Sequence, residues 1–189
     1  MEAAARLFAE RGFADADTQV LADKLGVGKG TIYRYFPSKR DLFLAAVDRA
    51  MRQLKNAVDE GLEVIEDPLE RMAHGIEAYL TFFAQHPEYV ELFVQERAQF
   101  KDRKKPTYFV HRDVNAERWR ELCRRMIAEG RFRDIPVERI LDVMGDMLYG
   151  TMFTNCFVGR TRSPKDQAQD ILDIALRGVL SDVERKREG

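Results

Sequence analysis

The side chains with the clearest capacity for chemistry lie between Asp17 and Phe36, in the sequence DTQVLADKLGVGKGTIYRYF. The second half of this segment offers hydrogen-bond donors and flat amphipathic rings: Lys29, Thr31, Tyr33, Arg34 and Tyr35. Lysine and arginine donate to guanine edges, whereas threonine and tyrosine suit thymine methyl groups and phosphates. These residue types therefore indicate a surface that could enter a groove of double-stranded DNA.

Basic residues are concentrated in and beside this segment. The chain of 189 residues has a formal net charge of -1 at pH 7, which gives no overall attraction to nucleic acid. From residue 24 to residue 40, however, no acidic residue interrupts the basic ones, which are Lys24, Lys29, Arg34, Lys39 and Arg40. Such a local concentration allows a protein of nearly neutral charge to hold phosphate.

Two short helices, expected over residues 18–25 and 29–35, must position these side chains. Gly26 stands at the turn between them, where the left-handed backbone conformation suits glycine, and Ala22 is small enough for a close approach. The apolar residues expected to pack the two helices on a third are Leu21, Leu25, Val27 and Ile32. Taken alone, this pattern fits a helix-turn-helix or a small helical hairpin with a basic surface.

The rest of the chain is also typical of helix, and we expect an all-α protein because no run of alternating apolar and polar residues predicts a sheet. Asp67 and Ser163 are expected to cap helices. The prolines expected at first helical positions are Pro68, Pro87, Pro136 and Pro164. Helices are expected over 1–11, 18–25, 29–35, 39–65, 68–85, 87–101, 107–129, 136–159 and 164–186.

Composition narrows the class of protein. With 45% hydrophobic and 33% charged residues the chain should fold, and no apolar run approaches the roughly 20 residues of a membrane helix. The charged, alanine-rich start predicts no signal peptide, so we expect a cytoplasmic protein with buried thiols at Cys123 and Cys156. Since the histidines and cysteines lack metal-ligand spacing and no glycine-rich phosphate loop occurs, we expect no enzyme activity, no cofactor and no metal.

Two stretches resemble the N-terminal domain of the TetR family: AARLFAERGF (Ala4–Phe13) and LADKLGVGKGTIYRYFPSKRDLFLAAV (Leu21–Val47). The match includes the Gly-Thr-X-Tyr-X-Tyr-Phe and Ser-Lys-X-X-Leu-Phe elements, a continuation that a recombinase or sigma-type module would not share. The resemblance implies a three-helix helix-turn-helix DNA-binding domain over 1–47. A long helix would join it to a larger helical ligand-binding and dimerisation domain over 48–189.

The resemblance also assigns DNA contacts by position. It implies that the helix over 29–35 meets bases and backbone, and that Lys39 opens the next helix where a phosphate is favoured. Asp17 stands where the family often has threonine; it should cap its helix but repel phosphate, so the phosphate contact is expected from Thr18. Gly28 replaces the usual serine, and no contact from a basic N-terminal arm is expected. The predicted DNA-binding residues are Thr18, Lys29, Gly30, Thr31, Tyr33, Arg34, Tyr35 and Lys39.

The helices over 136–159 and 164–186 are apolar on more than one face. A surface helix needs only one apolar stripe, so a second stripe predicts that the helix packs against a second partner. Burial of both stripes in one large core is the alternative. In the TetR family these helices form a four-helix bundle with their copies, and the resemblance therefore implies a homodimer. The predicted interface residues are Leu172, Ala175, Leu176 and Val179.

A small-molecule effector pocket is a further implication of the resemblance. Most aromatic residues in this part of the chain are expected to be core, with Arg97 and His111 able to receive an acidic ligand and Glu96 with Arg112 as a structural ion pair. The basic segment Lys101–Thr107 is expected to be a solvated loop on the far side from the DNA helices. The predicted pocket residues are Tyr79, Phe82, Arg97, His111, Trp119, Met147 and Asn155.

The resemblance thus implies a transcriptional regulator, a repressor released from a palindromic DNA operator by an effector. A structural or interaction protein that uses only its helical bundle is the alternative. Salt-dependent binding to duplex DNA separates the two, because phosphate contacts release counterions.

Overall fold

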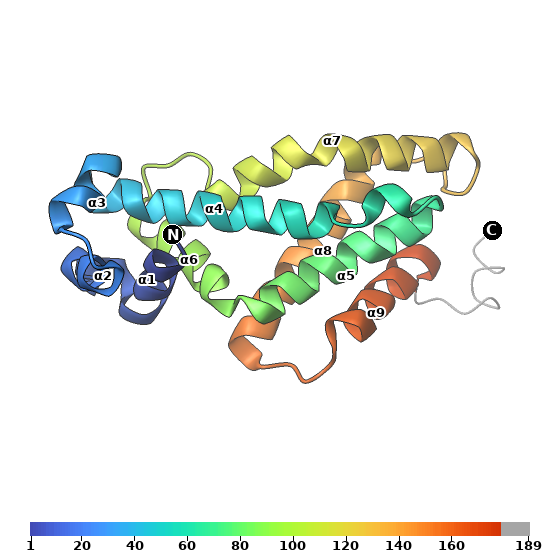
Figure 1. Ribbon diagram of the computed structural model, residues 1–189. Coiled ribbons are helices and arrows are strands. Elements are labelled where there is room, and N and C mark those ends of the chain that lie inside the picture. Colours follow the sequence, from blue (N-terminus) through green and yellow to red (C-terminus); the bar gives the residue numbers. More distant parts are fainter. Residues whose placement is uncertain (179–189) are drawn as a thin grey trace. The chain divides into compact units, whose positions relative to one another are not determined.

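A computed structural model describes residues 1–178, which form nine α-helices, one 3-10 helix and no strand (Figure 1). The all-α prediction is confirmed. The chain divides into two compact units: the first holds Met1–Asn56 and Gln85–Glu117, and the second holds Ala57–Ala84 and the residues from Arg118 onward. The helices are α1 (Glu2–Asp15), α2 (Thr18–Leu25), α3 (Lys29–Tyr35), α4 (Lys39–Asp59), α5 (Pro68–Gln85), α6 (Pro87–Gln99), α7 (Thr107–Ala128), α8 (Val137–Val158) and α9 (Pro164–Arg177).

Side-chain caps begin several helices as the sequence predicted. Asp17 accepts a hydrogen bond from the backbone of Gln19 at 2.8 Å, at the start of α2. Asp67 accepts from Leu69 at 2.8 Å and Ser163 accepts from Asp166 at 3.1 Å, so both cap their helices. Pro136 differs from the expectation, because its ψ of 128° places it before the helix and α8 begins one residue later.

Helix α4 is shorter than predicted. It ends at Asp59 instead of residue 65, because Gly61 adopts a left-handed conformation with φ of 77° and stops the helix. A 3-10 helix over Leu62–Val64 follows, with Leu62 buried. Only the last residues of α4 therefore belong to the second unit.

An aromatic cluster forms the centre of the first unit. The ring of Phe43 on α4 lies 5.1 Å from that of Phe8 and 5.4 Å from that of Phe13, both on α1. Phe100, which directly follows α6, lies 4.9 Å from Phe13. Helix α6 also packs beside α1 (Figure 1), where the buried Gln95 side chain donates to the carbonyl of Phe8 at 2.9 Å. Three helices are thus joined through one apolar centre.

The segment between α6 and α7 is attached to the first turn of α4, and its expected position away from α2 and α3 stays a prediction. Arg40, in the first turn of α4, donates to Asp102 at 2.6 Å, and its guanidinium lies 4.8 Å from the Phe100 ring centre. Lys101, Lys104 and Lys105 are exposed, as expected of a solvated loop, but Phe100 and Asp102 fasten the segment to α4.

Glu96 holds the beginning of α7. Its side chain is 1% exposed, and Oε1 accepts hydrogen bonds from the backbone of Thr107 at 2.9 Å and its hydroxyl at 2.8 Å. Arg103 supplies the ion pair, with Nε 3.2 Å from the same oxygen. The expected pairing of Glu96 with Arg112 is therefore replaced by contacts within the connection to α7.

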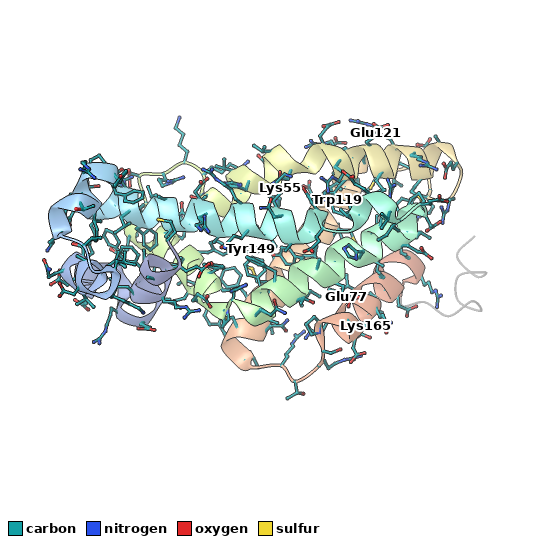
Figure 2. All side chains as sticks on the ribbon, in the orientation of Figure 1. Lys55, Glu77, Trp119, Glu121, Tyr149 and Lys165 are labelled. Carbon is teal, nitrogen blue, oxygen red and sulfur yellow. The ribbon has the colours of Figure 1, made fainter. Side chains whose placement is uncertain are left out.

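Two contacts link the helices of the second unit through named side chains. Trp119 on α7, which is labelled in Figure 2, packs over Gly75 on α5. The hydroxyl of Tyr79 on α5 donates to the sulfur of Met152 on α8 at 3.4 Å. Cys123 is fully buried, as predicted, and burial raises the pKa of its thiol, whereas Cys156 is half-buried. No helix within residues 1–178 is long and apolar enough to cross a membrane.

Candidate nucleic-acid interface

Helices α2 and α3 and the turn between them have the bounds that the sequence predicted. Gly26 has φ of 65° and ψ of 30°, the left-handed conformation that ends α2. The backbone of Val27 donates to the carbonyl of Ala22 at 3.0 Å, which satisfies a carbonyl at the helix end. The turn therefore fixes the angle at which α3 leaves α2.

The support beneath α3 is smaller than the sequence suggested. Leu21, Ala22 and Ile32 are buried, as expected. Leu25 and Val27 are 51% and 38% exposed, so their predicted packing was wrong. Both flank Gly26, and a turn between two helices this short leaves its own flanks open to solvent.

The hydroxyl of Thr18 lies inside the helix pair. Its Oγ1 is 3.0 Å from the hydroxyl oxygen of Tyr33, and the residue is only 3% exposed. The phosphate contact expected of Thr18 therefore has no exposed hydroxyl to make it in this structure. Thr18 instead orients Tyr33 on α3.

The outward side of α3 presents the chemistry predicted for a DNA groove. Tyr35 is 68% exposed, and the guanidinium of Arg34 lies 5.2 Å from the centre of its ring. A Cβ at Gly30 would meet nothing within 4 Å, so the backbone there is open to a close approach. Thr31 is half-buried on the same short helix.

The two lysines predicted to contact DNA both have partners within the protein. Lys29 Nζ lies 3.3 Å from Asp17 Oδ1. Lys39 Nζ donates to the carbonyl of Ala14 at 2.8 Å and lies 5.2 Å from the centre of the Phe13 ring. Hydrogen bonds from the Gln19 backbone and from Lys29 hold the pKa of Asp17 below its ordinary value. Asp17 is therefore an anion beside the recognition surface at neutral pH.

The predicted effector residues are divided between the two units. In the first unit, Arg97 is exposed, and His111 Nε2 lies 2.8 Å from Asp48 Oδ1, so His111 is already paired with a carboxylate. In the second unit, Tyr79 and Phe82 are buried, whereas Trp119, Met147 and Asn155 are half-buried. The pocket as a set remains a prediction.

One hollow of about 440 Å³ lies in the second unit, between the end of α8 and the start of α9. It contains none of the predicted effector residues. Asn155 does not line the hollow itself, but its amide donates a hydrogen bond at 2.7 Å to Gln167, which does. The Asn155 Oδ1 atom is buried and has no hydrogen-bond partner among the described residues. The described residues contain no group of three side chains that could hold a metal ion.

Helices α8 and α9 leave much apolar surface uncovered. Of the residues of α8, all within the described part of the chain, Met152 alone is buried. Val143 and Phe157 on α8 are 58% and 59% exposed, and Leu176 on α9 is 44% exposed. Leu172 is half-buried and Ala175 is exposed, while Val179 lies outside the described residues. Within residues 1–178, the core therefore does not cover the second apolar stripe.

A short helix, a turn at a left-handed glycine and a second short helix with exposed donors define a helix-turn-helix DNA-binding domain. The chain belongs to the TetR family of bacterial transcriptional regulators. The family's sequence profile, bacterial regulatory proteins of the tetR family, matches residues 1–46, and the profile of the tetracyclin repressor-like C-terminal domain matches residues 66–179. The family predicted from the sequence is confirmed.

Curated relatives match parts of the chain. The transcriptional activator FasR of Mycolicibacterium smegmatis is 34% identical over 80 residues, which are 42% of this chain and 36% of FasR. The regulator EthR of the same organism is 32% identical over 85 residues, 44% of this chain and 39% of EthR. The chain thus matches well under half the length of both. The repressor KstR2 of Mycobacterium tuberculosis is 26% identical over 152 residues, covering 77% of this chain and 74% of KstR2.

Solved structures match nearly the whole chain. The TetR family regulator PfmR of Thermus thermophilus has a TM-score of 0.76 and 26% identity, covering 95% of this chain and 98% of PfmR. FadR of Bacillus subtilis in complex with stearoyl-CoA has a TM-score of 0.80 and 17% identity, covering 95% and 97%. A protein of Saccharomonospora viridis in complex with choline has a TM-score of 0.73 and 23% identity, covering 92% and 91%. The last two share the fold.

Proposed function

We propose that this regulator binds a palindromic operator as a homodimer and represses transcription until a small-molecule effector releases it. The observation that carries the proposal is the outward side of α3, where Arg34 and Tyr35 are exposed beside the open backbone of Gly30. Donors and aromatic rings on a short exposed helix suit the major groove. Thr18 contributes to DNA affinity by orienting Tyr33.

Selection of duplex DNA by the purified protein tests operator binding. A palindromic consensus is expected, with affinity that falls steeply as salt rises, because phosphate contacts release counterions. Thr31→Val should change the ranking of operator variants, whereas Thr154→Val, the same substitution on α8, should leave it unchanged. Absence of salt-dependent binding to any duplex would contradict the function.

The homodimer is supported by the uncovered apolar residues of α8 and α9. A two-fold axis through these helices would bring the two copies of α3 to half-sites roughly 35 Å apart, about one turn of DNA. Each protomer alone would read one half of the palindrome. Assembly and operator affinity are therefore expected to fail together.

The effector is proposed to be a small, largely hydrophobic molecule bound in the second unit. Its apolar residues Tyr79, Phe82, Trp119 and Met147 suit such a ligand, and the unpaired Asn155 Oδ1 could accept one hydrogen bond. The stearoyl-CoA of FadR and the choline of the Saccharomonospora protein indicate that the fold accepts different ligand classes. The class of effector must therefore be found by experiment.

A thermal-shift screen of fatty acyl compounds and quaternary amines, followed by operator release, would identify the effector. A coupling of about 1–3 kcal/mol should weaken operator binding roughly 5–150-fold. Asn155→Leu should weaken the response, and Thr154→Val should not. An unchanged response in Asn155→Leu would remove Asn155 from the site.

The direction of regulation is proposed from the family's usual behaviour. The names of the relatives include both an activator, FasR, and a repressor, KstR2. A reporter gene under the control of the selected operator should be expressed less when the protein is present. Increased expression would make the protein an activator and leave its DNA binding intact.

A further inference from the structure

Asp17 joins the beginning of α2 to the beginning of α3. Its Oδ1 atom accepts the capping hydrogen bond from the Gln19 backbone at 2.8 Å and also lies 3.3 Å from Lys29 Nζ. The two side chains are 60% and 42% exposed, so DNA could approach both. The cap fixes the carboxylate, and the carboxylate in turn fixes the position of the lysine.

Lys39 adds to the positive charge around this carboxylate. The pKa of Asp17 is lowered by the hydrogen bonds from Gln19 and Lys29 and, to a smaller extent, by the charges of Lys29 and Lys39. Asp17 thus remains ionised at the pH where DNA is bound. The surface predicted to meet DNA carries a built-in anion next to its lysines.

The pairing changes what Lys29 can offer to DNA. A lysine ammonium has three N–H donors, and the contact with Asp17 occupies one of them. The paired ammonium and carboxylate have no net charge, so their attraction to phosphate is weak. The remaining donors can still reach neutral acceptors such as N7 and O6 of guanine, where hydrogen bonding depends on geometry.

We propose that Asp17 is a specificity-determining residue: as the counter-ion of Lys29 it suppresses binding to DNA of arbitrary sequence while leaving Lys29 able to read a base. The inference rests on the proposed operator binding. A phosphate that approaches Lys29 meets an ion pair with no net charge, whereas a guanine edge needs only one of the remaining N–H donors. Asp17 therefore widens the difference in affinity between operator and other DNA.

Asp17→Asn is the informative substitution, because asparagine keeps the capping oxygen and removes the charge. Binding should be measured with the selected operator and with a scrambled duplex of equal length, at 50 and 200 mM salt. Each lysine newly available to phosphate should steepen the salt slope by about 0.9, which is about 3.5-fold more loss of affinity across this range. For two protomers we expect roughly a 10-fold steeper loss on scrambled DNA.

The ratio of operator to scrambled affinity should fall in Asp17→Asn at 50 mM salt, because the scrambled duplex gains more than the operator. Asp15→Asn makes the same charge change at the end of α1 and should leave the ratio nearly unchanged. An unchanged ratio in Asp17→Asn, or an equal fall in Asp15→Asn, would overturn the inference. Thermal melting of each variant checks that the helices stay folded.

A double variant tests whether Asp17 acts through Lys29. In a Lys29→Met background, Asp17→Asn should no longer steepen the salt slope, because no ammonium is released. If the slope steepens as much as before, Asp17 repels DNA directly and the inference is wrong. If the wild-type protein binds neither duplex, the proposed function fails, which is a different result from an unchanged specificity ratio.

Discussion

The indole ring of Trp119 occupies the space that a side chain at Gly75 would need. A Cβ atom at position 75 would lie 2.4 Å from Cη2 of Trp119 and 3.0 Å from Cζ2. Real Cβ atoms do not approach other atoms so closely, so glycine is required for α5 and α7 to pack in this way. The pair sets the spacing of two helices in the second unit.

Gly75→Ala should lower the free energy of unfolding by about 1–3 kcal/mol, because the rigid indole must shift within a packed core. Urea denaturation measures the loss. Gly150→Ala on α8 is the matched control: a Cβ there meets nothing within 4 Å, so stability should be unchanged or rise by up to about 1 kcal/mol. Trp119→Leu in the Gly75→Ala background should recover part of the loss, and strictly additive losses would argue against the clash.

Lys39→Ala should weaken binding to every duplex and lower the salt slope by roughly one per protomer. Lys39 begins α4, where its ammonium is held by the Ala14 carbonyl at 2.8 Å and can bridge α1 and a phosphate. Lys165→Ala removes the same charge from α9 and should leave the slope unaltered. A Lys39→Ala protein with wild-type affinity for all DNA would exclude the phosphate contact.

Charges on α9 should separate the protomers. Leu172→Glu together with Ala175→Glu places carboxylates on the apolar face of α9, and sedimentation should then detect monomers with reduced operator affinity. Arg177→Gln is the control, since it also makes the chain more negative but alters a side chain that is 78% exposed. A wild-type monomer at micromolar concentration would contradict the proposed dimer.

Asp48 should make stability depend on acid pH. Burial raises the pKa of Asp48, but hydrogen bonds from His111 and Arg52 outweigh it and leave the pKa below its ordinary value of 3.8. A lowered carboxyl pKa stabilises the fold above the ordinary value, and this contribution is lost as pH falls through the folded pKa. Asp48→Asn should therefore cost up to about 1 kcal/mol at pH 7, because the carboxyl is partly exposed.

The two proteins should differ less at pH 3 than at pH 7 in urea denaturation. Asp113→Asn provides a comparison, because Asp113 is an exposed acid on α7 paired with Lys105. A difference between wild type and Asp48→Asn that stays constant down to pH 3 would show that the charge of Asp48 is not what stabilises the contact.

Local features of the fold could be predicted from the sequence, because their causes are local. Gly26 at the turn and the caps Asp67 and Ser163 depend on conformations and hydrogen bonds within a few residues. The early end of α4 at Gly61 had a signal of the same kind, since a glycine within a predicted helix is a common stop. The bounds of α2 and α3 were therefore predicted well, whereas α1, expected to end at residue 11, ends at Asp15.

Contacts between distant segments could not be predicted in this way. The contact of Thr18 with Tyr33 and the hydrogen bond that Glu96 accepts from Thr107 depend on how the helices pack. The periodicity of apolar residues does not specify this packing. The position of Phe100 against Phe13 likewise depends on the packing of α6 on α1. The residue types exposed on α3 were predictable from the sequence. The side chains within the protein that contact them were not.

The aromatic centre of the first unit has a consequence for synthesis of the chain. Its rings come from α1, α4 and Phe100, so the DNA-binding helices lack part of their apolar support until residue 100 has left the ribosome. By then residues 57–84, which belong to the second unit and include nearly all of α5, have already emerged between the two segments of the first unit. A nascent chain ending near residue 56 would therefore expose Phe8 and Phe43. We expect α1–α4 to fold stably only after the segment that contains Phe100 has been synthesised.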